Sequence, residues 1–342
     1  MAHPIGIGLL GLGTIGASHA RALHALRERA QLVAYSGGTP ERAAEAGWPA
    51  AEQHPPEEVL SDDRVGVVAL ATPSAQHAQQ ALAALDAGKH VVVEKPLAMT
   101  AADADRVVER AQAQGLQVAV MAQRRLEPEL VAVKQALEQG RLGAVRLAIT
   151  QVNWWRDPSY YEAAAWRGEA GNGGSLLNQG VHNVDLLTWL AGPVESVTAQ
   201  QATLAHATEA EDTTVATVRF ASGALGLLST STATPPGSPA TLALHCARGV
   251  VEVGQGEILR WDVEGEPAPR IAPAEAIGVG ASDPGAIGIA GHVQQWDDVL
   301  TALADGRAPS ITGRDGAATV RLLDALSTAA ATGRTVTLEE LS

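Results

Sequence analysis

The strongest constraint in this sequence is the segment GIGLLGLGTIG, residues 6–16, which matches the dinucleotide-binding pattern G-x-G-x-x-G twice. A phosphate-binding turn has to follow a strand and begin a helix. Residues 5–10 form an apolar run typical of a strand, so the earlier match lies largely inside that strand. The later match, GLGTIG at 11–16, is followed by alanines and leucines at helical spacing. The later match is the predicted phosphate turn.

Each glycine of this turn has a separate task. Gly11 allows the tight turn, Gly13 lets the backbone approach a pyrophosphate, and Gly16 lets the helix pack close to the strand. Thr14 and Ile15 complete the turn and begin the helix, whose free N–H groups and dipole favour phosphate.

The first 121 residues alternate short apolar runs with longer Ala-rich amphipathic segments. The expected strands are 5–10, 31–36, 65–72, 90–94 and 117–121, and the expected helices are 14–29, 40–46, 75–87 and 100–114. Such alternation predicts an α/β fold with a doubly wound parallel sheet of Rossmann type, covered by helices on both faces.

The pattern changes after about residue 145. A helix near 174–190 precedes strand-like runs at 194–204, 212–220, 224–232 and 240–246, and helices follow at 290–305 and 314–332. Consecutive strands joined by short turns predict a large, mostly antiparallel open sheet. We expect a Rossmann domain at 1–122 and a second α/β domain at 123–342, with a terminal helix able to pack back on the first domain.

Charge and cysteine content exclude several classes of partner. The 342 residues carry a net charge of -14, which argues against nucleic acid and anionic membranes as partners. Cys246 is the sole cysteine, so the chain has no intramolecular disulfide and fits a reducing compartment. The N-terminus lacks a basic region, and prolines interrupt the longest uncharged run, 221–247. We expect a cytoplasmic protein.

The end of the second strand bears on the choice of cofactor. NAD sites usually carry a carboxylate about 20 residues after the glycine turn, where it binds the ribose. Here the strand ends in YSGG, residues 35–38, with no carboxylate. Ser36 and Thr39 can bind a 2′-phosphate, and Arg42 follows on the next helix. This favours NADP over NAD, unless Arg42 is an ordinary solvated residue.

The tripeptide Glu94-Lys95-Pro96 follows the fourth strand directly. Ligands of doubly wound sheets bind at the carboxyl ends of the strands. Lys95 could exchange a proton with a substrate oxygen there, since burial and a positively charged nicotinamide would lower its pKa. The alternative is a lysine that only ends a strand.

A second constellation lies in the segment 171–192, GNGGSLLNQGVHNVDLLTWLAG. Asn178, His182, Asp185 and Trp189 follow one another at spacings of four, three and four, which places them on one face of an α-helix. His182 could relay a proton, oriented by Asp185 or helped by Asn178. Alternatively, His182 is a buried histidine satisfied by Asp185.

These blocks resemble the Gfo/Idh/MocA oxidoreductases over essentially the whole chain. The resemblance rests on the glycine turn, ATPSAQH (71–77), VVVEKPLAMT (91–100), the helix just described, EDTTVATVRFASGALGLLSTSTATPPG (211–237) and the C-terminal VLTALADGRAPSITGRDGAATVRLLDAL. It implies hydride transfer between a nicotinamide and a hydroxyl carbon of a sugar, polyol or related small molecule. It also implies a homodimer or homotetramer that associates through the C-terminal sheet.

The resemblance assigns roles to single residues. The family's catalytic lysine matches Lys95, and its catalytic histidine matches His182. Several members carry Asp where this chain has Asn178, which cannot accept a proton, so we assign Asn178 to substrate binding together with Asp185. The expected cofactor set is completed by Thr72, Pro73, His77, Glu94, Pro96 and Gln123.

Aromatic residues gather in VNWWRDPSYYEAAAWRG, residues 152–168. We expect substrate contacts from Trp155, Arg156, Tyr160 and Trp166, because aromatic rings stack on sugars and arginine pairs with carboxylate or phosphate. Core packing or a subunit contact is the alternative.

No histidine pair has the spacing of a helical zinc site, so no metal is expected. Two other functions stay open. One is an NAD-dependent glycoside hydrolase without net cofactor turnover, and the other is a cofactor-binding sensor without catalysis.

Overall fold

The computed structural model describes residues 3–271 and 288–341. The chain forms two compact units. Unit 1 comprises Met1–Gln123 and Ile289–Val320, and unit 2 comprises Arg124–Gly288 and Arg321–Ser342.

Unit 1 is built on a six-stranded parallel sheet with the order β3-β2-β1-β4-β5-β6. Its strands are β1 (Ile5–Leu10), β2 (Ala30–Ser36), β3 (Glu52–Gln53), β4 (Val67–Leu70), β5 (His90–Val93) and β6 (Val118–Val120). The predicted doubly wound parallel sheet is confirmed. The order reverses between β1 and β4, and ligands of such sheets bind at this switch point.

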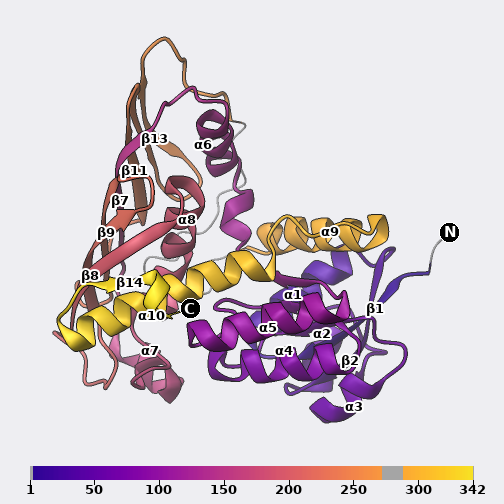
Figure 1. Ribbon diagram of the computed structural model, residues 1–342. Coiled ribbons are helices and arrows are strands. Elements are labelled where there is room, and N and C mark those ends of the chain that lie inside the picture. The colour runs from indigo at the N-terminus through magenta and orange to yellow at the C-terminus, as the bar shows by residue number, and fades with distance from the viewer. Residues whose placement is uncertain (1–2, 272–287, 342) are drawn as a thin grey trace. The chain divides into compact units, whose positions relative to one another are not determined.

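Helices cover both faces of this sheet (Figure 1). They are α1 (Thr14–Ala25), α2 (Pro40–Glu45), α3 (Pro56–Ser61), α4 (His77–Asp86), α5 (Ala101–Gln114) and α9 (Ala290–Asp305), with a 3-10 turn η1 (Ser74–Gln76). In β4, Val67 packs in the core with α1 and α9, whereas its neighbour Val68 packs with α4 and α5. The alternation follows from the two-residue period of a strand buried on both faces.

Unit 2 contains an eight-stranded sheet with the order β13-β12-β11-β7-β10-β9-β8-β14. The strands are β7 (Val145–Asn153), β8 (Val194–Ala202), β9 (Thr213–Phe220), β10 (Leu225–Ser231), β11 (Thr241–Cys246), β12 (Gly249–Val253), β13 (Ile258–Val263) and β14 (Val336–Thr337). All neighbours pair antiparallel except β10 and β7, which are parallel. The expected mostly antiparallel sheet is confirmed.

The helical elements of unit 2 are α6 (Pro128–Glu138), α7 (Pro158–Glu162), α8 (Val181–Ala191), the 3-10 turns η3 (Ala165–Gly168) and η6 (Leu338–Leu341), and the π-helix η4 (Leu176–Gly180). The 3-10 turn η2 (Gln123–Leu126) begins at the last residue of the first segment of unit 1 and continues in unit 2. Helix α10 (Gly313–Thr332) begins in unit 1 and ends in unit 2. Sequence patterns did not identify α6, β7, β12 or β13.

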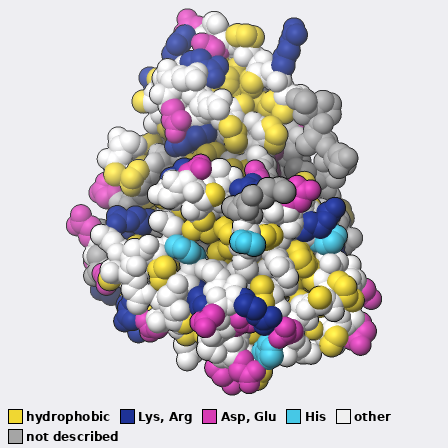
Figure 2. Space-filling view, turned by 90° about the vertical axis from the view of Figure 1, so that its right-hand side faces the viewer, with side chains coloured by type: hydrophobic (Ala, Val, Ile, Leu, Met, Phe, Trp, Pro, Cys, Tyr) yellow, Lys and Arg dark blue, Asp and Glu magenta, His cyan; other side chains and the backbone are white. Residues whose placement is uncertain are grey.

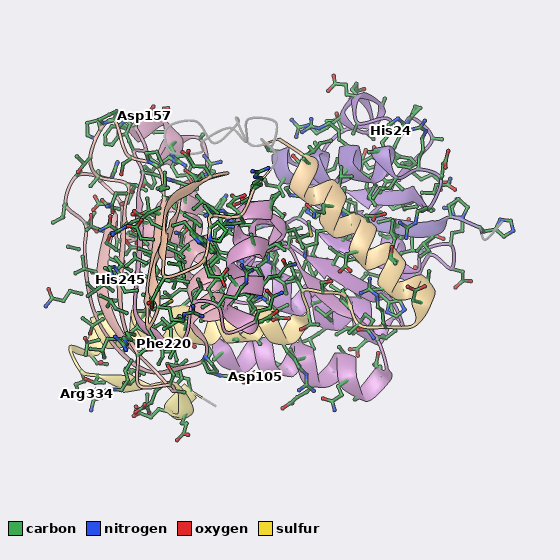
Figure 3. The ribbon with its side chains drawn as sticks, turned by 90° about the horizontal axis from the view of Figure 1, so that it is seen from above. His24, Asp105, Asp157, Phe220, His245 and Arg334 are labelled. Atoms are coloured by element: carbon green, nitrogen blue, oxygen red, sulfur yellow. The ribbon has the colours of Figure 1, made fainter. Side chains whose placement is uncertain are left out.

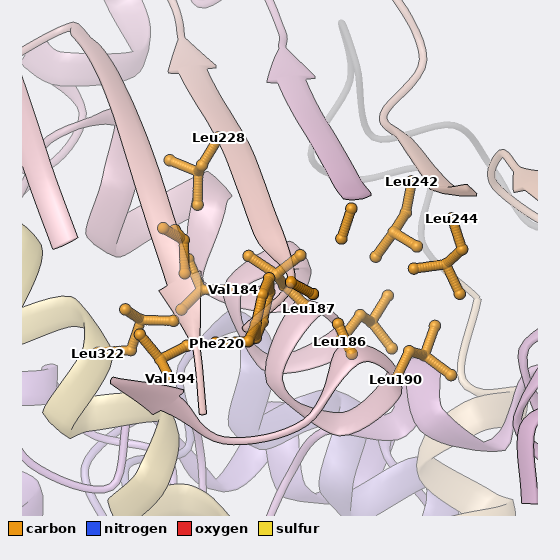
Figure 4. Packing of buried hydrophobic residues seen from close by; sticks show 14 of the residues in the cluster. Val184, Leu186, Leu187, Leu190, Val194, Phe220, Leu228, Leu242, Leu244 and Leu322 are labelled. Carbon is orange, nitrogen blue, oxygen red and sulfur yellow. The ribbon is translucent and has the colours of Figure 1, made fainter. Parts of the chain in front are cut away.

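One face of the unit 2 sheet packs against α8 and α10. Phe220 is fully buried in this core, close to Val194 and to Leu187 of α8 (Figure 4). The opposite face is open: Val215 is 49% exposed and Leu227 is 46% exposed. This sheet has one packed face and one face with exposed apolar side chains.

The described part of the chain contains no helix that is both long and apolar enough to cross a membrane. The surface shown in Figure 2 carries basic and acidic side chains mingled with one another, without a continuous basic field.

Candidate active site

Four strand ends of unit 1 lie along one edge of the sheet. Leu10 pairs with both Ser36 and Leu70, and Leu70 pairs with Val93. The residues that follow these positions are the glycine turn, the predicted cofactor-selecting loop, the Thr72 segment and the Glu94-Lys95-Pro96 turn. Parallel pairing thus gathers segments that are as far apart in the sequence as Gly11 and Lys95.

Two positions of the glycine turn, Gly11 and Gly16, have no space for a side chain. Gly11 has a φ of +94°, and a Cβ atom there would lie 2.6 Å from the carbonyl oxygen of Ala71. A Cβ at Gly16 would lie 1.9 Å from the carbonyl oxygen of Gly11. Gly13 faces open space, with no described atom within 4 Å of a Cβ added there. A flat anionic group can therefore approach the main chain at Gly13.

The start of α1 suits phosphate. Its N-cap, Gly13, offers no side chain to the first N–H groups, and its first turn contains no acidic residue. These N–H groups and the helix dipole are what phosphate requires. Ile15 is 44% exposed beside them and gives an apolar surface for a cofactor to cover. The residues present fit a dinucleotide.

The loop after β2 places Arg42 beside this turn. The Arg42 Nη1 group donates a hydrogen bond to the carbonyl oxygen of Leu12 at 3.4 Å. Thr39 caps α2 by accepting the main-chain N–H of Arg42 at 3.4 Å. Hydrogen bonds from its own N–H and from Thr39 lower the pKa of Glu41, a carboxylate that the sequence interpretation did not consider. Ser36 is buried at the strand end.

The Glu94 carboxylate is held from two helices of unit 1. His19 Nε2 lies 3.0 Å from Glu94 Oε1, and His292 Nε2 lies 3.4 Å from the same oxygen. The main-chain N–H of Lys95 donates to Glu94 Oε2 at 3.2 Å. Behind His19, the Trp296 indole N–H donates to His19 Nδ1 at 3.0 Å.

Burial and hydrogen bonding oppose each other in this cluster. Burial by itself would raise the pKa of Glu94, but the hydrogen bonds from His19 and His292 prevail and hold it well below the ordinary value. Burial lowers the pKa of Lys95, while the charge of Glu94 raises it in part. A lowered lysine pKa is what proton transfer near neutral pH requires.

His77 braces the other side of the same turn. Its ring lies between two carbonyl oxygens, with Nδ1 2.7 Å from Pro96 O and Nε2 2.9 Å from Thr72 O. The Thr72 hydroxyl donates to Gln80 at 2.6 Å. His77 is buried, and burial lowers its pKa. In this structure it joins the two loops at the sheet edge.

Two other residues of the expected cofactor set lie at loop starts in unit 1. Pro73 is exposed and precedes η1. Gln123 begins η2 and is half-buried, and a Cβ at Gly291 of α9 would lie 3.0 Å from its Cγ. Their cofactor contacts stay predictions.

The helix that carries His182 begins with a π-turn over Leu176–Gly180, ahead of α8. The prediction that Asn178 and His182 share one face assumed α-helical spacing throughout, and that assumption is wrong over the π-turn. The Asn178 amide donates to the carbonyl oxygen of Arg167 at 3.3 Å. His182 is half-buried in the first turn of α8. Short π segments are frequent at functional sites because they reorient side chains.

Arginines anchor α8 in unit 2. Arg125 binds both carboxylate oxygens of Asp185, at 2.8 Å and 2.7 Å, and both side chains are buried. Arg124 donates to the side-chain oxygen of Asn183 at 2.8 Å. The structure therefore brings Asp185 to Arg125, and its expected substrate contact stays a prediction.

The aromatic segment packs around Arg156, which is 4% exposed. The guanidinium carbon of Arg156 lies 5.0 Å from the Trp154 ring centre and 5.4 Å from that of Tyr160. Burial lowers the pKa of Arg156. Gln179 of the π-turn donates to the Tyr160 hydroxyl at 3.0 Å, which ties this segment to the helix of His182.

Arg167 also lies over the ring of Tyr160. Its guanidinium carbon is 4.2 Å from the Tyr160 ring centre and 5.8 Å from that of Trp166. Trp155 instead lies beside His206, with ring centres 5.7 Å apart. The predicted aromatic residues thus divide between an arginine-centred group and a contact with His206.

Sequence reasoning missed three members of the Glu94 cluster, namely His19, His292 and Trp296. His19 had a signal, since it lies three residues after Gly16 on the buried face of α1. The other two lie on α9, 198 and 202 residues after Glu94, and no local pattern connects them with it.

Comparison with known proteins agrees with this geometry. Residues 5–122 match the oxidoreductase family with an NAD-binding Rossmann fold, and residues 130–252 match the GFO/IDH/MocA C-terminal domain. The WlbA dehydrogenase from Bordetella pertussis, solved with NADH and UDP-GlcNAcA, is 35% identical, with 98% of each chain covered and a TM-score of 0.86. The chain belongs to the Gfo/Idh/MocA oxidoreductase family.

Two curated relatives of this Gfo/Idh/MocA protein are inositol dehydrogenases. Myo-inositol 2-dehydrogenase from Thermotoga maritima is 27% identical, covering 98% of this chain and 99% of the relative. The scyllo-inositol 2-dehydrogenase (NADP(+)) IolW from Bacillus subtilis is 30% identical, covering 57% of this chain and 54% of the relative. The chain is an NAD(P)-dependent oxidoreductase that acts on CH–OH groups.

Glu211 gives this Gfo/Idh/MocA protein a pH-dependent stability. Its carboxylate accepts hydrogen bonds from Ser175 Oγ at 2.7 Å and from the main-chain N–H of Leu176 at 2.8 Å, at the start of the π-turn. Burial raises the pKa of Glu211 to about 7. A carboxyl whose pKa rises on folding favours the folded state at low pH, and this contribution is lost as pH increases through the folded-state value.

We predict that the wild type loses on the order of 1–3 kcal/mol relative to Glu211→Gln between pH 5 and pH 8. Free energies of unfolding from denaturant titrations at the two pH values measure this difference. Glu209→Gln, at an exposed position nearby, is the control and should follow the wild type. Equal pH dependence in all three proteins would contradict the assignment.

Proposed function

We propose that the protein oxidises or reduces a hydroxyl carbon of a sugar, polyol or related compound, with Lys95 and His182 as its proton-transfer residues. The observation that carries the proposal is the position of Lys95, which follows β5 at the same sheet edge as the glycine turn. The names of the relatives support a sugar-like substrate.

In the oxidation direction, a bound nicotinamide supplies the hydride acceptor. Neutral Lys95 accepts the proton of the substrate hydroxyl, and the carbon that bears this hydroxyl gives up its hydrogen as hydride, so that the C–O bond becomes a carbonyl. His182, whose imidazole is on α8, is the second group that can accept or return this proton. The Asn178 amide holds a neighbouring hydroxyl, and the aromatic residues of the 152–168 segment offer faces for a sugar ring.

We predict that Lys95→Met and His182→Ala each lose on the order of 100-fold or more in kcat while still binding the cofactor. The loss in the double variant should be smaller than the product of the single losses, because both residues serve the same proton transfer. Steady-state kinetics and cofactor titrations test both statements. His54→Ala, which removes a solvent-accessible histidine of unit 1, should keep full activity. Near-normal turnover by His182→Ala would contradict the proton-transfer role of His182 and leave it a structural role.

We infer a preference for NADP. No carboxylate follows β2 directly, and the Arg42 guanidinium lies beside the glycine turn through its bond to Leu12. A 2′-phosphate at the end of β2 would meet this positive charge. A single buried thiol, Cys246, and an NADP requirement both suit the cytoplasm.

We predict that NADP binds at least tenfold more tightly than NAD, a difference of ~1.4 kcal/mol. Ser36→Asp should reverse this order by placing a negative charge where the 2′-phosphate would lie, and Arg42→Ala should remove it. Arg21→Ala, at an exposed arginine of α1, is the control. Fluorescence titrations with both cofactors measure the preference, and tighter binding of NAD by the wild type would overturn it.

One assay of the purified wild type with added cofactor distinguishes a dehydrogenase from a glycoside hydrolase and from a sensor. Incubation with myo-inositol, scyllo-inositol, UDP-GlcNAcA or an aryl glycoside gives three separable outcomes. Accumulation of reduced cofactor supports the dehydrogenase, and aglycone release without it supports a glycoside hydrolase. Binding without either supports a sensor.

We also propose a homodimer or homotetramer formed through the open face of the unit 2 sheet. Leu225 and Leu227 of β10 are 52% and 46% exposed, and Val215 of β9 is 49% exposed. A hollow of about 510 Å³ over Ile149, Thr217 and Leu227 lies on this face. Exposed apolar side chains on a wide sheet are typical of an interface between subunits.

We predict that the wild type sediments as a dimer or tetramer and that Leu227→Glu sediments as a smaller species, because a charge would be buried in the interface. Leu204→Glu is the matched control, since Leu204 is 69% exposed outside the sheet. Analytical ultracentrifugation measures both. A monomeric wild type at micromolar concentration would refute this assembly.

A further inference from the structure

Glu94 lies at the centre of a hydrogen-bonded group that the proposed chemistry does not itself require. The group contains His19 from α1, and His292 and Trp296 from α9, with exposed fractions of 0%, 4% and 0%. The two helices lie beside each other in unit 1 (Figure 1). Burying four polar side chains is costly unless each is hydrogen-bonded in a defined way.

Counting donors fixes the arrangement. The Trp296 indole nitrogen can only donate, so His19 Nδ1 accepts and His19 Nε2 carries the proton. His19 Nε2 therefore donates to Glu94, which is an acceptor in its ionised form. His292 Nε2 faces the same oxygen and donates as well. Its Nδ1 is buried and has no hydrogen-bond partner among the residues that the structure describes.

The same count argues against a metal ion. His19 Nε2, Glu94 and His292 Nε2 lie within 4.8 Å of one another, close enough to share a cation. A metal-binding histidine normally donates its second N–H to an outer acceptor. Here the second nitrogen of His19 accepts from Trp296, so ligation would require an imidazolate. The geometry suits two neutral imidazoles that donate to a carboxylate.

The Glu94 carboxylate acts on Lys95 through a hydrogen bond and through its charge. The main-chain N–H of Lys95 donates to the second oxygen of Glu94, and the carboxylate charge acts on the lysine amine. The titratable groups that face Glu94 are His19 from α1, His292 from α9, Lys95 beside it and His77 of α4, which responds to its charge. Loss of the histidine donors would leave a buried carboxylate that tends to take up a proton.

We propose that His19, His292 and Trp296 are positioning residues for Lys95. They hold Glu94 as a buried carboxylate, which fixes the main chain and the electrostatic surroundings of the lysine. The inference rests on the proposed role of Lys95 as the proton-transfer residue. A histidine on the phosphate-turn helix thereby couples the cofactor site to the lysine within one unit.

The test compares His19→Leu and His292→Leu with His19→Gln, which keeps an N–H donor. When Glu94 takes up a proton, Lys95 loses the neighbouring negative charge, so its pKa decreases. We expect the acid limb of the pH–kcat profile for alcohol oxidation to move down by about one pH unit in the leucine variants. We also expect kcat to fall about tenfold with cofactor binding within threefold of the wild type, and His19→Gln to stay near the wild type.

A second measurement makes the result independent of activity. The rate at which an amine-specific acylating reagent modifies Lys95, followed against pH by peptide mass spectrometry, reports the Lys95 titration itself. His24→Leu is the matched control, because His24 also lies on α1 (Figure 3). Its ring is edge-on to a different tryptophan, Trp48, with the ring centres 5.5 Å apart. This substitution should leave both profiles unchanged.

The outcomes separate the two proposals. Unshifted Lys95 labelling and kcat profiles in His19→Leu and His292→Leu would overturn the positioning role, even if Lys95→Met is inactive. An active Lys95→Met would overturn the proposed function, while a shifted labelling profile would still support the positioning role. Stoichiometric zinc in the purified protein that is lost in His19→Leu would show a metal site and contradict the hydrogen-bond arrangement.

Discussion

Parallel strand pairing is the constraint on which the rest of unit 1 depends. Because β1 pairs in parallel with β2 on one side and with β4 on the other, the loops that follow these strands emerge at one edge. The β4–β5 pairing adds the turn that contains Lys95 to the same edge. The glycine turn, the loop after β2 and Lys95 are therefore neighbours because their strands pair in parallel.

The side chains of Glu94 and His77 also hold the loops at this edge in place. Glu94 is joined to α1 and α9, and His77 bridges the carbonyl groups of Thr72 and Pro96. Both braces bury polar atoms, and a buried polar group stabilises a structure only when its partners are in place. The arrangement limits the positions open to Lys95, the residue that we propose for proton transfer.

In unit 2, buried polar contacts fix the orientation of a helix. Its helix α8 is held by the buried Arg125–Asp185 ion pair and by Arg124 on Asn183, while a π-turn precedes it. A buried ion pair adds little net stability but fixes orientation, because breaking it leaves an uncompensated charge. Orientation is the useful property for a helix that presents His182.

The sequence by itself determined the Rossmann fold, the choice between the two glycine matches and the candidates Lys95 and His182, because each depends on local spacing or on the strand–turn–helix order. Residue spacing also suggested an uninterrupted helix over 174–190, and it could not reveal the π-turn, which shifts the phase by one residue. Only the tertiary structure decided that Asp185 pairs with Arg125 and that Glu94 pairs with His19 and His292. Those contacts join segments 60 to nearly 200 residues apart, and such partners are selected by packing and burial, which local patterns do not encode.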